Sequence, residues 1–72
     1  MAKYEDPVAQ AERHVREAEN RIARQRSLIY ELESHGHTAS ANDARDLLKT
    51  FQDTLTVARN HLRIEREQHK PR

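Results

Sequence analysis

The 72-residue sequence has no cysteine, no tryptophan and a single glycine, Gly36. Without cysteine, neither disulfides nor the cysteine-based zinc sites that stabilise many small domains can form. A chain this short buries only roughly 60% of the surface that its unfolded form exposes, so it needs a further source of stability. Self-association is the common remedy that remains.

Long apolar runs and an excess of charge of one sign are also missing. No stretch approaches the roughly 20 apolar residues that span a bilayer, and the N-terminal residues lack the apolar core of a secretion signal. The 13 Lys and Arg residues nearly cancel the 12 Asp and Glu residues, which leaves a formal net charge of +1. This balance disfavours nucleic-acid binding driven by counterion release. We therefore expect a cytoplasmic protein that does not contact membranes.

Two long segments with heptad patterning lie on either side of Gly36. Asp6 and Pro7 predict a helix start, because aspartate can cap the first turn and proline loses no hydrogen bond at the first helical position. From there, seam residues recur in steps of three and four over a first helix expected at about residues 7–34. These seam residues are Val8, Ala11, Val15, Ala18, Ile22, Gln25, Ile29 and Leu32.

The same spacing resumes after a turn predicted at residues 35–39. Gly36 suits the left-handed position that follows the last turn of a helix, and Thr38 or Ser40 can cap the second helix. We expect that helix over about residues 40–68. Its seam residues are Ala41, Ala44, Leu48, Phe51, Leu55, Ala58, Leu62 and Glu65.

These patterns predict one domain over residues 1–72, with an all-α fold: an antiparallel two-helix coiled-coil hairpin. Matching the two seams places Ile22 opposite Leu55 and Gln25 opposite Phe51. The same register pairs opposite charges along one flank, namely Glu12 with Arg66, Glu19 with Arg59, and Glu33 with Arg45. Exposed ion pairs contribute only about 0 to 1 kcal/mol each, but their complementarity helps to fix register and partner choice.

Gln25 is the one polar residue in the seam of the first helix. A buried amide costs stability unless it is hydrogen-bonded, and a polar seam residue can fix register and oligomeric state. Two alternatives are open: the amide bonds Gln52, or the side chain extends to solvent.

The other flank is not closed by charge, because a second apolar stripe runs beside the seam of the second helix. A lone hairpin cannot cover this stripe, and at about 0.8 kcal/mol per methylene its exposure forfeits several kcal/mol. We therefore predict that the chain dimerises into a four-helix bundle. The predicted dimer interface comprises Leu28, Leu47, Thr54, Val57, His61 and Ile64. The alternative is that these are scattered surface aliphatics of the ordinary kind.

Histidine is the only residue type that suggests site chemistry. His35 and His37 lie in the predicted turn, and His14 and His61 are predicted neighbours on the open flank. A tight transition-metal site needs three or four converging ligands, and no carboxylate has a spacing that completes either pair. We expect no metal site, no cofactor and no catalytic residue. His14 and His61 would instead make assembly sensitive to pH near about 6.5.

A resemblance adds to this interpretation. The run Ala11-Glu12-Arg13-His14-Val15, continuing through Ile22 to Leu32-Glu33, then a His/Gly turn and Leu47-Leu48 through Phe51 to Leu55, resembles small stand-alone bacterial α-helical hairpin proteins of uncharacterised function. The likeness covers about residues 11–66 and implies an all-helical hairpin with no assigned activity. The topology is also similar to plasmid copy-number regulators that form a four-helix bundle from two hairpins and bind paired RNA, and that likeness is architectural only.

We therefore expect a non-enzymatic helical interaction or regulatory module that acts as a homodimer, with another helical protein as the alternative partner. The serines offer no nucleophile, because they lie at helix surfaces or caps without a positioned base. A second hypothesis is an RNA-binding four-helix bundle, motivated by the arginines of the first helix. These are Arg13, Arg16, Arg21, Arg24 and Arg26. Because glutamates are interleaved with them, a solvated, ion-paired helix face is preferred.

Overall fold

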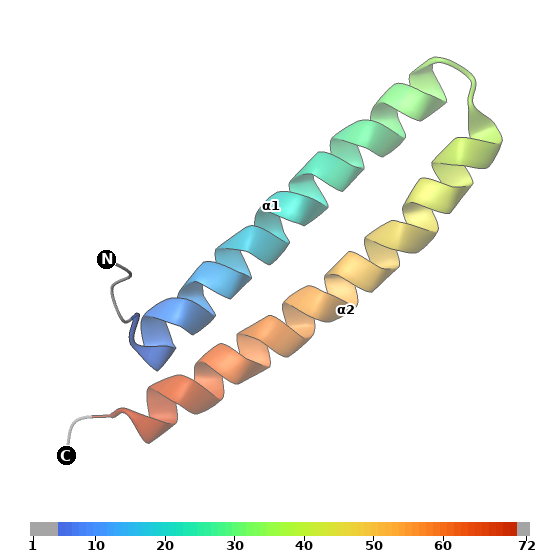
Figure 1. The fold of residues 1–72 in the computed structure, drawn as a ribbon. Helices are drawn as coiled ribbons and strands as arrows, with labels where there is room; N and C mark the ends of the chain where they lie inside the picture. The colour runs from blue at the N-terminus through green and yellow to red at the C-terminus, as the bar shows by residue number, and fades with distance from the viewer. Residues whose placement is uncertain (1–4, 71–72) are drawn as a thin grey trace.

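The computed structural model describes residues 5–70 and shows two antiparallel α-helices joined by a short turn (Figure 1). Helix α1 spans Pro7–Ser34 and helix α2 spans Thr38–Gln68. The start of α1 and the end of α2 lie together at the end of the hairpin that is remote from the turn. The prediction of an all-α hairpin of two packed helices is confirmed.

Helix α1 begins at the predicted cap. Asp6 is extended, with φ −67° and ψ 157°, and its Oδ1 accepts a hydrogen bond of 2.9 Å from the backbone N–H of Ala9. Pro7 follows at the start of the helix, where it removes no intrahelical bond. Beside this cap the Arg13 guanidinium lies 2.9 Å from the Glu5 carboxylate. Its hydrogen bonds hold the pKa of Glu5 below the ordinary value.

The turn is shorter than predicted. Helix α2 begins at Thr38 rather than near residue 40, and no side chain caps it. The chain reverses through Gly36, whose φ of 74° is in the left-handed region. The N–H of Gly36 donates to the Glu33 carbonyl at 3.1 Å and that of His37 to the Leu32 carbonyl at 2.8 Å. This pair of bonds is a Schellman motif, which satisfies the last carbonyls of α1 and lets the next helix start at once.

The core is a single layer of side chains between the two helices. The Cα atoms extend over 56 × 28 × 12 Å, so the hairpin is one helix thick. The buried residues are Ala11, Ala18, Ile22, Gln25, Ile29, Ala41 and Ala44. Even Ile22 and Ile29 keep 6% and 7% of their surface exposed, and the later seam residues of α2 are only half-buried. Two helices alone therefore give a shallow core.

The predicted ion pairs across one flank are all present. Arg66 lies 3.3 Å from Glu12, Arg59 lies 3.4 Å from Glu19, and Arg45 lies 2.6 Å from Glu33. Their side chains are 42–62% exposed, so each pair contributes little to the free energy of unfolding.

The contacts at the seam correct the predicted environment of Gln25. Its Nε2 donates a 2.8 Å hydrogen bond to the backbone carbonyl of Ala44, and only 7% of the residue is exposed. The amide is thus neither bonded to Gln52 nor extended to solvent. The guanidinium carbon of Arg21 lies 5.7 Å from the centre of the Phe51 ring. Ala44 lies nearer the turn than Phe51, which the predicted register placed opposite Gln25.

Candidate interaction surface

The two long edges of the seam differ in kind. We call the edge that carries the ion pairs the charge-paired flank; it comprises Glu12, Glu19, Glu33, Arg45, Arg59 and Arg66. We call the opposite edge the open flank; it comprises His14, Arg21, Leu28, Leu47, Thr50, Thr54, Val57, His61 and Ile64. Because α1 and α2 are regular helices, residues spaced by three or four positions stay on the same edge along the hairpin.

Large apolar side chains are exposed on the open flank. Val57 is 69% exposed, Leu47 46%, Leu28 44% and Ile64 37%. Thr54 and His61 are also exposed, so all six residues of the predicted dimer interface lie on the surface of the hairpin. Tyr30 is 74% exposed, but it lies off this flank.

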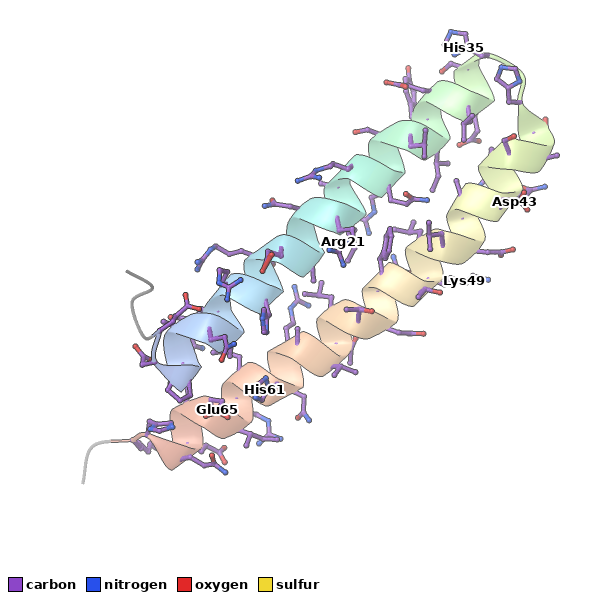
Figure 2. The ribbon with its side chains drawn as sticks, in the orientation of Figure 1. Arg21, His35, Asp43, Lys49, His61 and Glu65 are labelled. Carbon is purple, nitrogen blue, oxygen red and sulfur yellow. The ribbon has the colours of Figure 1, made fainter. Side chains whose placement is uncertain are left out.

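A shallow groove of about 510 Å³ marks the middle of the open flank. Its walls bring Glu17 and Arg21 of α1 together with Thr54, Val57 and His61 of α2. His14 also lines it, so the predicted neighbours His14 and His61 share one groove. Figure 2 shows Arg21 reaching from α1 toward α2, where its guanidinium covers the Phe51 ring. The floor includes Ala18 and Ala58, whose short side chains leave the groove unfilled.

The hairpin exposes more surface than a compact protein of its size. Its accessible surface is 5884 Å². A folded monomer of 8.5 kDa is expected to expose roughly 4,700 Å². The excess of about 1,200 Å² is in keeping with the elongated shape of a hairpin that is one helix thick.

A cluster at the end of α2 was not anticipated. Glu65 lies between two histidines: its Oε1 is 3.2 Å from Nε2 of His61, and its Oε2 is 3.3 Å from Nε2 of His69. Figure 2 shows His61 and Glu65 as neighbours on α2. The spacing of four residues between successive members is the available signal, but the heptad pattern places Glu65 only in the seam.

The turn histidines do not form part of this cluster. The rings of His35 and His37 stack with centroids 6.4 Å apart, and Nδ1 of His35 lies 2.8 Å from the Glu31 carbonyl oxygen. Within residues 5–70, no three His, Asp or Glu side chains are arranged to hold a metal ion.

The cations of α2 are segregated, which the sequence interpretation also missed. Every Lys and Arg in this helix falls on one stripe, which includes the charge-paired flank: Arg45, Lys49, Arg59, Arg63 and Arg66. Near the end of the helix, Arg59, Arg63, Arg66 and Lys70 line one depression. Glutamates already pair with Arg45, Arg59, Arg63 and Arg66, so much of this positive charge is neutralised within the hairpin.

Comparison with known proteins gives no assignment. No protein-family model, curated protein or solved structure matches the chain. The resemblance to bacterial hairpin proteins and the expected place in the cytoplasm therefore stay predictions. Neither α1 nor α2 is apolar enough over a sufficient length to cross a membrane.

Proposed function

We propose that the protein is a non-enzymatic helical interaction module that pairs with a second copy of itself into a four-helix bundle. The exposed apolar row of the open flank carries this proposal: Leu28, Leu47, Val57 and Ile64 are 37–69% exposed. Full burial of such a side chain is worth about 1.5–3 kcal/mol, so covering the remaining surface of all four is worth about 3–6 kcal/mol per chain. A small domain with a shallow core gains substantially from that burial.

The net charge of the chain and the composition of this surface are compatible with a second copy as the occupant. The formal net charge of +1 means that two copies repel each other only weakly. Apart from His14, Arg21 and His61, the face is made of Leu, Val, Ile and Thr at helical spacing, which is typical of a packed helix interface. Another helical protein remains the alternative occupant.

Thermal unfolding at several protein concentrations tests the proposal. If the folded state is a dimer, the thermal midpoint followed by circular dichroism rises as protein concentration is increased tenfold, because dissociation accompanies unfolding. A midpoint that is the same at every concentration would exclude the dimer as the folded species.

RNA binding is the second candidate, and the segregation of cations on α2 favours it. A single positive stripe can follow a phosphate backbone, and real phosphate contacts make affinity fall steeply with salt. Titration against structured RNA at about 50 mM and about 200 mM salt is the test. Lys49 and Lys70 lie on or beside the stripe, so the double variant Lys49→Gln/Lys70→Gln should weaken binding and flatten the salt dependence. Absent or salt-independent binding rules this candidate out.

A further inference from the structure

We infer that the two copies pack like helix on like helix, with α2 antiparallel to the partner's α2, α1 antiparallel to the partner's α1, and the two turns at opposite ends. This inference rests on the proposed homodimer and specifies its geometry. Two hairpins stacked face to face with two-fold symmetry have two arrangements. In the first arrangement the two-fold axis is perpendicular to the helices, and each helix stacks on the same helix of the partner. In the second the axis is parallel to the helices, and α1 stacks on the partner's α2.

The apolar stripe on α2 has the symmetry that the first arrangement requires. Its positions follow steps of three, four, three, four and three, which read the same in both directions: Leu47, Thr50, Thr54, Val57, His61 and Ile64. A two-fold axis between Thr54 and Val57 places Leu47 on the partner's Ile64 and Thr54 on the partner's Val57. The largest apolar side chains then meet each other at both ends of a seam about 25 Å long.

The same axis brings opposite charges together on α1. The groove of the open flank holds Glu17 and Arg21 at the level of Thr54 and Val57, so the axis crosses α1 between these two charged residues. Antiparallel stacking of α1 then sets Glu17, whose carboxylate lies 3.2 Å from Arg13 of its own chain, against the partner's Arg21, and symmetry repeats the contact. One axis position thus satisfies the apolar stripe of α2 and the charges of α1 together.

The other arrangement lacks this complementarity. Stacking α2 on the partner's α1 would place Val57 and Ile64 against a row that includes Glu17, Arg21 and Arg24. The charged row would lose water against aliphatic side chains, and Val57 and Ile64 would gain little apolar contact. The residues on the exposed faces of α1 and α2 therefore favour the arrangement in which each helix packs on the same helix of the partner.

Distances between spin labels distinguish the two arrangements. The chain contains no cysteine, so Ser34→Cys gives one label at the turn of each copy. Like-on-like packing separates the turns by about 45 Å, whereas the alternative brings them within about 20 Å. Asn20→Cys, near the proposed axis, is the control, because its two labels lie within about 30 Å in either arrangement.

Pulsed electron paramagnetic resonance on both variants gives three distinct outcomes. A distance near 45 Å at Ser34 together with a short one at Asn20 supports the inference. Short distances at both sites overturn the arrangement and leave the homodimer standing. No dipolar coupling at either site, with the sedimentation mass of one chain, overturns the homodimer and the arrangement together.

Discussion

The two flanks of this hairpin border the same seam, but one carries ion pairs across it and the other carries exposed apolar side chains. On the charge-paired flank, Glu12, Glu19 and Glu33 form ion pairs across the seam with Arg66, Arg59 and Arg45 of the same chain. On the open flank, Leu, Thr and Val side chains are too short to cover one another, and they stay exposed. The difference teaches that long charged side chains find partners across a two-helix seam within one chain, whereas the apolar side chains beside it stay exposed.

The largest effect is expected from breaking the open flank with Leu47→Glu. The substitution removes an apolar side chain that is 46% exposed in the hairpin and puts a charge in the proposed interface, twice in a symmetric dimer. The dissociation constant should rise about 100-fold or more. Sedimentation velocity at a series of concentrations measures this shift.

Tyr30→Glu is the matched control for that experiment. It introduces the same side chain at a position that is more exposed, 74%, and lies off the open flank. Assembly should change little. Equal weakening by both variants would show that added negative charge, and not the open flank, determines self-association.

The next largest effect is expected at the turn, which lies outside both flanks. Gly36 has a φ of 74°, and nothing lies within 4 Å of a Cβ placed there, so Gly36→Ala adds only backbone strain. We expect a loss of about 1–2 kcal/mol in the free energy of unfolding, or about 5 °C or more in the thermal midpoint. Asn tolerates this conformation better, so Gly36→Asn should lose less. Equal losses for both variants would contradict this explanation.

A smaller effect of opposite sign is expected at the seam between the flanks. Gln25→Leu removes the side-chain hydrogen bond to the Ala44 carbonyl and adds apolar surface at a buried position. The carbonyl still accepts its backbone hydrogen bond within α2, so it is not left without a partner. The thermal midpoint should rise by a few degrees, about 1 kcal/mol, while the sedimentation profile broadens as the choice of assembly loosens. A lower midpoint would mean that the buried bond is net stabilising.

The smallest effects are expected on the charge-paired flank. Double-mutant cycles should give coupling energies below about 1 kcal/mol for Glu19–Arg59 and for Glu33–Arg45. The second pair is closer, 2.6 Å against 3.4 Å, so its coupling should be the larger. Both should shrink in about 1 M salt. A coupling of several kcal/mol would show that this flank holds the hairpin together.

Much of the fold could be predicted from local chemistry and periodicity. Asp6 and Pro7 marked the start of α1, because the cap depends only on neighbouring residues. The steps of three and four defined both helices, and the ion pairs followed from the charges beside the seam. Arginine and glutamate side chains are long enough to form an ion pair even where the two helices are shifted from the predicted register. Prediction of these pairs therefore did not need an accurate register.

The remaining details depended on the three-dimensional path of the turn. The Schellman bonds from the N–H groups of Gly36 and His37 end α1, and α2 begins directly afterwards at Thr38. No side chain caps this helix start, so the sequence carries no local signal for it. The bond from Gln25 to Ala44 uses a backbone carbonyl, and backbone acceptors are present at every residue, so the sequence does not single this one out. The exposed row of the open flank was predicted because apolar residues off the seam are visible in the heptad pattern.

Sedimentation equilibrium of the unmodified protein at micromolar concentration tests the central claim most directly. The claim is that the open flank is covered by a second copy of the chain. We predict a mass twice that of the 8.5 kDa chain. A single species at 8.5 kDa across the concentration range would contradict it.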